Sequence, residues 1–346
     1  MRDEAKGMSD MPPILAELTR NGTPESRHRG WVAVARGDGT LVAHAGDPEQ
    51  LTFPRSAMKP FQAVAVVESG AADRFAFSDE ELAICCGSHH GERRHRETVA
   101  GILAKIGQPA TALLGAIDPP YNAERERLAE AGDEVAQRLA QNCSGKHAGM
   151  LAACVALGYP TETYDAADHP HQRAIRSIVA QFWDVPEDQL VAGLDNCTLP
   201  AFAAPIRNVA TGWARIADPD SAPAEHREAI RRIGEAMGRE PFMVAGTAGL
   251  NTILMDVTGG RVLAKDGAEG VVCLAIRDKG LGVTVKLEDG SFRAHGVIVR
   301  DLLRRLDALK PGEDTALAAA FGERLESNRH QHVGDIRSTL DLRFVG

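Results

Sequence analysis

The segment Ser56-Ala57-Met58-Lys59 places a serine and a lysine three positions apart, directly before an apolar run. On a helix this spacing puts both side chains on one face, about one turn apart. A serine hydroxyl becomes an effective nucleophile when a neighbouring group removes its proton. A lysine can do this when burial or a nearby cation lowers its pKa. The pattern therefore predicts nucleophilic catalysis, although an N-cap serine followed by a surface lysine has the same spacing.

Two later segments supply further groups that such a site needs. Ser88 lies in a glycine-flanked polar loop after an apolar stretch, and Lys265 follows the strand-like run Arg261–Ala264. In β-lactamases and penicillin-binding proteins, a Ser-x-x-Lys helix, a serine loop and a Lys-x-Gly strand end form one site in this chain order. Singly, each piece reads as an ordinary loop or turn; together they predict a serine/lysine hydrolase. Its catalytic residues would be Ser56, Lys59, Ser88 and Lys265.

Two cysteines, Cys143 and Cys197, precede a helix start and a turn, and could approach each other. With a third ligand and a water they could hold Zn²⁺, which favours sulfur and nitrogen donors. By residue type, His147 is the default third ligand. Lys146 is an alternative whose amine must first lose its proton, at a cost that zinc affinity can offset. Two unrelated buried cysteines are the simpler interpretation, and a cysteine nucleophile at Cys143 has no support besides His147.

Strand pairs near both ends of the chain, with helices between them, must position these residues. Three hairpins of an antiparallel sheet are predicted, over Arg29–Ala45, Asn251–Ala264 and Val271–Leu287. Helical periodicity predicts helices over Lys59–Glu68, Asp79–Ala83, Arg93–Ile106, His147–Leu157, His169–Phe182, Ala224–Met237 and Gly296–Leu309. This order indicates an α+β fold, an antiparallel sheet with a large helical region, and not a βαβ series.

The length and the composition limit the organisation and the partners. We expect residues 1–12 to be a disordered tail, and residues 13–346 to form one domain with a helical lobe from about 56–240. Of the residues, 44% are apolar and 25% charged, and the net charge is -9 without a dense basic stretch. Nucleic acid is therefore not expected as a partner. Apolar stretches such as His147–Leu157 are too short for a membrane span, and Met1–Met11 lacks a signal peptide's apolar segment, so we expect a cytoplasmic protein.

Longer motifs give a more specific indication than these patterns. The chain resembles the L-asparaginase family of the Rhizobium etli inducible type, most specifically over Phe53–Gln62 and Asn142–Met150, and the match runs from about residue 13 to the C-terminus. The other matching segments are 25–30, 68–73, 78–82, 88–92, 195–197, 243–246 and 264–271. The resemblance implies a fold similar to serine β-lactamases and glutaminases, and hydrolysis of L-asparagine to L-aspartate and ammonia through an acyl-enzyme. The resemblance also implies a homodimer.

The resemblance also assigns site residues. It implies two tandems, Ser56 with Lys59 and Ser88 with Lys265. It implies a structural or substrate-positioning Zn²⁺ on Cys143, Lys146 and Cys197, with Lys146 in place of His147. The expected substrate-binding residues are Arg55, His89, Asp195 and Gly246. A glutaminase, whose substrate differs by one methylene, a β-lactam- or peptide-processing hydrolase, and a zinc-dependent binding protein without activity are the alternatives.

Overall fold

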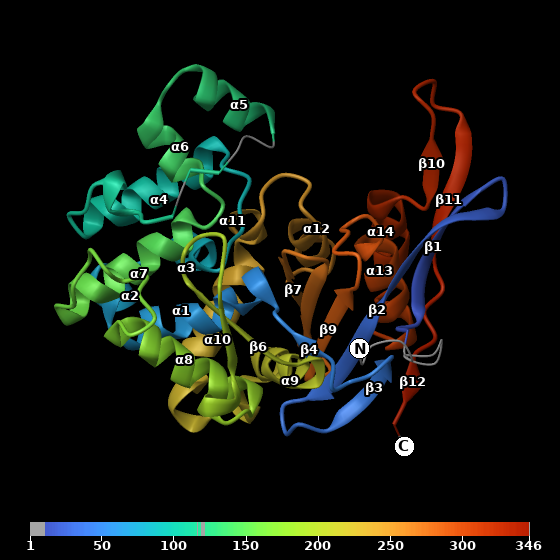
Figure 1. Ribbon diagram of the computed structural model, residues 1–346, viewed down its shortest axis with the longest axis horizontal. Helices are drawn as coiled ribbons and strands as arrows, with labels where there is room; N and C mark the ends of the chain where they lie inside the picture. Colours follow the sequence, from blue (N-terminus) through green and yellow to red (C-terminus); the bar gives the residue numbers. More distant parts are fainter. Residues whose placement is uncertain (1–10, 116, 119–121, 346) are drawn as a thin grey trace, which may run out of the picture.

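A nine-stranded antiparallel sheet forms one side of the molecule, and a helical region forms the other (Figure 1). The computed structural model describes residues 11–115, 117–118 and 122–345. The strands of this sheet are β1 (Ile14–Arg20), β2 (Thr23–Arg36), β3 (Leu41–Ala45), β7 (Val262–Gly267), β8 (Val271–Ile276), β9 (Leu281–Leu287), β10 (Arg324–Glu326), β11 (His332–Ser338) and β12 (Arg343–Phe344).

Within the sheet, the early strands β1 and β2 lie between two groups of strands from the last third of the chain. The order is β10-β11-β1-β2-β9-β8-β7, and β3 pairs with both β2 and β12. The register of β2 on β9 places Val32 opposite Val285, in the middle of the sheet. In Figure 1 the blue strands therefore lie directly beside the orange and red ones. The sheet is complete only when residues from both termini are in place.

The helical region lies between these two groups of strands in the sequence. Its helices are α1 (Lys59–Glu68), α2 (Ala71–Arg74), α3 (Asp79–Cys85), α4 (Arg93–Lys105), α5 (Ala123–Glu130), α6 (Glu134–Ala140), α7 (Ser144–Leu157), α8 (Pro170–Trp183), α9 (Ile206–Ala217), α10 (Arg227–Arg239), α11 (Pro241–Val244) and α12 (Leu250–Val257). A small sheet joins β4 (Leu51–Thr52), β6 (Pro200–Pro205) and β5 (Val191–Leu194). Helices α13 (His295–Arg305) and α14 (Glu313–Phe321) follow β9.

The large sheet has helices on both faces. Because side chains alternate along a strand, Val32 joins a cluster that includes residues of α13, whereas Ala33 joins one with Ile206 and Ala210 of α9. The α9 face is built mainly on the alanines Ala33, Ala35 and Ala210, with Ile206 beside them. A Cβ added at Gly282 of β9 would lie 2.0 Å from the carbonyl oxygen of Ala210, so only glycine allows α9 to lie this close to the sheet.

The predicted α+β class, with an antiparallel sheet and a large helical region, is confirmed. The hairpins at 29–45 and 271–287 form as predicted, since β2 pairs with β3 and β8 with β9. The predicted strand over Asn251–Asp256 is wrong, because this segment lies in helix α12. A short apolar run does not distinguish a strand from a buried helix by periodicity alone, and the exposure of Asp256 beside buried Leu254 and Met255 follows a helical surface.

The structure also bears on the predicted N-terminal tail and on membrane-spanning segments. The predicted disordered tail covers residues 1–12, of which residues 1–10 lie outside the described part of the chain. Within the part that is described, no helix combines the length and the apolar character that a membrane crossing requires.

Candidate active site

Ser56 lies in a short 3-10 helix, Arg55–Met58, that leads directly into α1. Pro60 at the start of α1 fixes the direction of the chain there, since proline is well suited to the first turn of a helix. Lys59 is fully buried, whereas Ser56 is half-buried. Among the described residues, the Ser56 hydroxyl makes no side-chain hydrogen bond, so its oxygen is available to a ligand.

The amine of Lys59 contacts the second predicted serine. Its Nζ donates hydrogen bonds to Ser88 Oγ, at 2.9 Å, and to the carbonyl oxygen of Gly87. Burial is the main cause that lowers the pKa of Lys59, because a charged amine loses its hydration. Cys143 opposes this shift, and the positive charges of Lys146 and Lys265 add to it. The predicted chemical condition for a lysine base, burial near another cation, is therefore present.

Ser88 lies in a loop after α3 that runs beside the segment after α11. The N–H of Ser88 donates to the carbonyl oxygen of Val244 at 2.8 Å, and that of His90 to Ala245 at 3.0 Å. The next residue is Gly246, at φ 111°, where an added Cβ would lie 2.6 Å from Glu92 Oε1. The backbone conformation favours glycine there, and a side chain would also displace the carboxylate of Glu92. The predicted Gly246 thus lies beside the Ser88 loop.

His89 is fully buried beneath this loop. Its Nε2 lies 3.0 Å from Ser144 Oγ, its Nδ1 accepts the N–H of Gly91, and its ring stacks on His95 at a centroid distance of 4.8 Å. Both ring nitrogens are therefore engaged within the protein. In this position His89 supports the loop that carries Ser88.

Lys265 reaches the same region from strand β7. It is fully buried, and its Nζ donates to Asp266 Oδ1 at 2.6 Å and to the Asp266 carbonyl oxygen at 2.8 Å. Gly267, two residues further on, faces the Ser56 turn, because an added Cβ would lie 2.0 Å from the carbonyl oxygen of Pro54. The end of β7 therefore touches the turn that holds Ser56. The hydrogen bonds of Lys265 go to Asp266, and Ser88 bonds to Lys59.

The two predicted cysteines and Lys146 form one buried group. Lys146 Nζ lies 3.0 Å from Cys197 Sγ, and Cys143 is hydrogen-bonded to Cys197. The hydrogen bond from Cys143 is the main cause that lowers the pKa of Cys197 to about 5, and Lys146 lowers it further. Burial acts to lower the pKa of Lys146, but Cys197, Cys143 and Asp195 outweigh it and raise that pKa. The surroundings of Cys197, above all Cys143 and the amine of Lys146, therefore favour its deprotonated form.

This group fits zinc in the chemistry of its donors. Two sulfur atoms and one amine nitrogen converge in a buried place, and one sulfur has thiolate character already, which is the form that binds zinc. His147 points elsewhere, since its Nδ1 lies 2.6 Å from the hydroxyl of Tyr164. Counting histidine, cysteine and carboxylate ligands alone, the described residues contain no group of three that could hold a metal. A metal bound at this place would therefore require the lysine amine as its third protein donor.

Arg55 connects the Ser56 turn to the cysteine segment. Its Nη2 donates to Asp195 Oδ1 at 2.7 Å and to Asn196 Oδ1 at 3.1 Å, while its buried Nε has no partner among the described residues. Arg55 adopts φ 53°, a left-handed conformation that is costly for a side chain other than glycine. Glu269 and Thr198 near the same site do so as well, at φ 63° and 73°. Backbone strain of this kind is often found at functional sites.

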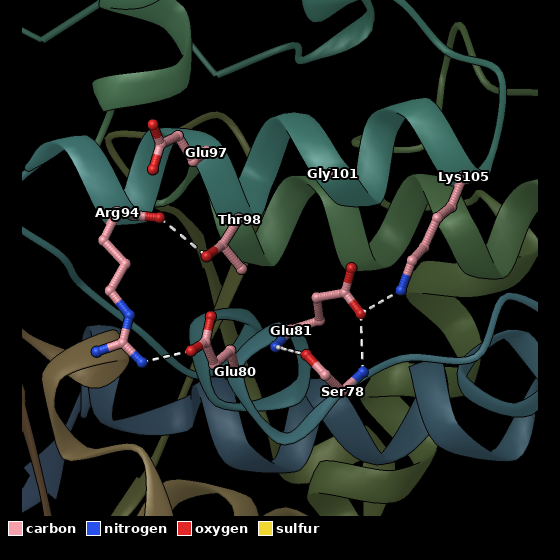
Figure 2. A pocket seen from close by; sticks show the side chains of 8 residues that line it. All are labelled: Ser78, Glu80, Glu81, Arg94, Glu97, Thr98, Gly101 and Lys105. Carbon is pink, nitrogen blue, oxygen red and sulfur yellow. Dashed lines mark hydrogen bonds and ion pairs between the residues drawn. The ribbon is translucent and has the colours of Figure 1, made fainter.

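Among the surface cavities, one adjoins the Ser56 turn and another lies away from it. One of about 380 Å³ is lined by Phe53, Arg55, Leu194, Glu269, Lys286 and neighbours, and thus opens beside the Ser56 turn. Figure 2 shows the other, of about 320 Å³, between α3 and α4. Its polar groups pair with one another, as Lys105 does with Glu81 and Arg94 with Glu80. None of the residues that line it belongs to the group around Ser56 and Ser88.

The sequence patterns did not identify Asn251 and Asp266 as members of the site. Asp266 stands between Lys265 and Gly267, so the Lys-x-Gly motif itself could have indicated it. Asn251 carries no such signal, because it was assigned to a strand, and its contact with Asp266 depends on how α12 packs on β7.

Comparisons with known proteins give one sequence family and distant structural similarities. The model of the L-asparaginase II family matches residues 16–338. The crystal structure of Mglu in its glutamate form is 18% identical, with 81% of this chain and 61% of that chain covered and a TM-score of 0.36. A β-lactamase from Mycobacterium bovis is 12% identical, with 90% and 96% covered and a TM-score of 0.35. The chain thus spans about three fifths of the length of Mglu. No curated protein matches the sequence.

Proposed function

Because the chain belongs to the L-asparaginase II family, we propose that it is an amidohydrolase of the asparaginase/glutaminase type that converts L-asparagine to L-aspartate and ammonia. Within that family we assign it to the Rhizobium etli inducible type, on the motifs that surround Ser56 and Cys143. The observation that carries the proposal is the fully buried Lys59, which is bonded to Ser88 at 2.9 Å and follows Ser56 by three positions, with the Ser56 hydroxyl unbonded among the described residues. A serine beside a buried amine is suited to acyl transfer.

The proposed reaction has two steps. In the first, Ser56 Oγ attacks the side-chain amide carbon, Lys59 accepts the hydroxyl proton, and that proton passes to the leaving nitrogen. The new C–O bond replaces the broken C–N bond, and ammonia leaves a β-aspartyl ester on Ser56. In the second, water attacks the ester, a proton returns to Ser56 Oγ, and aspartate is released. Ser88 bonds to Lys59 and relays protons, and Lys265 contributes positive charge.

Two sets of groups would hold the substrate. Arg55 and Asp195 lie beside the Ser56 turn and would bind the charged groups of the amino acid, with Gly246 leaving room near Ser88. We further propose that Cys143, Lys146 and Cys197 hold Zn²⁺, and the 3.0 Å contact of Lys146 with Cys197 supports this assignment. When bound, the ion would supply a positive charge and a bound water that fix the substrate. The family resemblance also implies a homodimer.

Ammonia release from L-asparagine and L-glutamine, measured in parallel on the purified protein, tests the substrate. We expect a preference for asparagine of roughly 10-fold or more in kcat/KM, within what one methylene can provide. Equal or faster release from glutamine would overturn the substrate assignment, and release from neither would overturn the amidohydrolase.

A further inference from the structure

The amine of Lys265 pairs with the carboxylate of Asp266, a residue that Asn251 contacts at two points. Lys265 Nζ lies 2.6 Å from Asp266 Oδ1. The same Oδ1 accepts the side-chain N–H of Asn251 at 2.7 Å, and the backbone N–H of Asp266 donates to Asn251 Oδ1 at 3.0 Å. One amide side chain therefore contacts both the carboxylate and the backbone of Asp266. Hydrogen bonds to a charged group are the stronger kind, and this pairing fixes the direction of the carboxylate.

Burial makes this arrangement specific. Asn251 and Lys265 are both fully buried, so neither can exchange these partners for bulk water. Burial acts to raise the pKa of Asp266, but Lys265, Asn251 and His295 lower it to about 2, so the carboxylate is charged at neutral pH. The carboxylate of Asp266 is half-buried and is the ion-pair partner of the fully buried amine, so removing it would leave a buried charge uncompensated. The ammonium charge of Lys265 is thereby fixed near the Ser56 turn, which Gly267 of the same strand contacts.

We propose that Asn251 and Asp266 are positioning residues that hold Lys265 as a fixed positive charge in the site, while Lys59 accepts the proton. The inference rests on the proposed amidohydrolase function and separates the roles of the two lysines, which the sequence patterns treat as equivalent. The contacts carry this division, because Lys59 bonds to a serine hydroxyl and Lys265 to a carboxylate. A fixed charge near the reacting carbonyl stabilises the negative oxygen that develops in the transition state.

Steady-state kinetics of Asp266→Asn with asparagine tests the proposal, with kcat normalised to active sites by the burst of ammonia in the first turnover. The substitution keeps the shape of the side chain and removes its charge. We expect kcat to fall at least tenfold, KM to stay within twofold, and Asp266→Glu to recover part of kcat because it restores the carboxylate. Asp256→Asn, an exposed position on α12, is the matched control and should change neither constant.

A purely structural role would reduce the number of active sites and leave the normalised kcat unchanged, and that result would overturn the inference. If Asp266→Asn does not fold, Asn251→Ala provides the test, since it keeps the Asp266 carboxylate and removes the hydrogen bonds of Asn251 to that carboxylate and to the Asp266 backbone. It should lower the normalised kcat in the same direction, and an unchanged kcat would again contradict the proposal. Failure of the wild-type protein to release ammonia would overturn the proposed function instead, so the two failures are distinguishable.

Discussion

The side-chain nitrogen of Lys59 lies 2.9 Å from the hydroxyl oxygen of Ser88, a residue from a separate loop. The serine that precedes Lys59 by three positions keeps its hydroxyl unbonded within the described chain. One lysine is therefore bonded to one serine and lies about one helical turn along the chain from the other. In this arrangement the bonded serine is suited to proton transfer, and the unbonded serine is suited to attack.

We predict that Ser56, and not Ser88, carries the acyl group. Ser56→Ala should lower kcat by at least about 10³-fold, because it removes the nucleophile. Ser88→Ala should lower kcat by about 10²-fold, the usual contribution of a proton-transfer group, and should still form the acyl-enzyme. Mass spectrometry of rapidly quenched reactions with asparagine measures this. An acyl adduct on a Ser88 peptide would instead identify Ser88 as the nucleophile and leave proton transfer to Ser56.

Lys59 should make stability depend on pH in a defined direction. Its pKa in the folded state is lowered by burial from the usual value of about 10.4. At low pH both states are protonated and the full burial cost applies. As the pH rises between the two pKa values, only the unfolded state keeps the proton, so the folded protein gains stability.

The free energies of unfolding of wild type and Lys59→Met, compared by urea denaturation at several pH values, test this dependence. The wild type should gain stability relative to the variant as the pH rises toward about 10. Lys310→Met, at an exposed position, should show no such change. A difference between wild type and Lys59→Met that is constant with pH would contradict the burial argument.

Zinc content should depend on Cys197 and not on a cysteine outside the group. Wild type grown with zinc should contain about one ion per chain, and Cys197→Ser should lose most of it, because the thiolate ligand is removed. The control is Cys154→Ser, a buried cysteine of α7. Elemental analysis of the purified proteins gives the answer, and equal zinc in all three would argue against the assigned ligands.

Arg55 should affect substrate affinity more than turnover. Arg55→Ala removes the partner of the Asp195 carboxylate, and loss of one member of a desolvated charge pair typically costs about 2–5 kcal/mol. We expect KM for asparagine to rise by about 10²-fold or more, with a smaller effect on kcat. Arg55→Lys should recover little, since lysine lacks the planar fork. If kcat falls while KM is unchanged, Arg55 acts on the chemical step instead.

Gly282 should be the least replaceable glycine of the sheet. Gly282→Ala places a methyl group against the backbone of α9, and we expect it to destabilise the protein by about 1–3 kcal/mol or more. The matched substitution is Gly101→Ala in helix α4, where an added Cβ has space, and this should stabilise by up to about 1 kcal/mol. Thermal unfolding of both variants provides the comparison. A neutral Gly282→Ala would mean that α9 does not lie this close to the sheet.

Local patterns predicted most of the elements and the chemical types in the site. The hairpin predicted over Arg29–Ala45 forms from β2 and β3, and the helix predicted from Asp79 begins there, after Ser78, which forms a capping box with Glu81. The error at Asn251–Asp256 arose because its environment comes from packing on β7. Helix α9 was not predicted, although Ile206, Val209 and Trp213 recur at helical spacing in its sequence.

The contacts within the site depend on long-range packing, which sequence spacing does not describe. Ser56, Ser88 and Lys265 were identified by type, but the bond of Lys59 to Ser88 joins α1 to the loop after α3. The pairing of Lys265 with Asp266 likewise requires the amide of Asn251 from α12. A motif gives the residues that are available, and the tertiary structure decides which of them form pairs.

The contact of Gly267 with Pro54 joins two segments that are synthesised at different times. During synthesis the Ser56 turn leaves the ribosome long before β7 does, because the helical region lies between them in the sequence. Lys265, Asp266 and the wall formed by Gly267 are then still missing. A nascent chain, or an N-terminal fragment that ends before β7, therefore has the Ser56 turn without its opposite wall. On the proposed function, hydrolytic activity would be acquired late, when the last third of the chain completes the sheet.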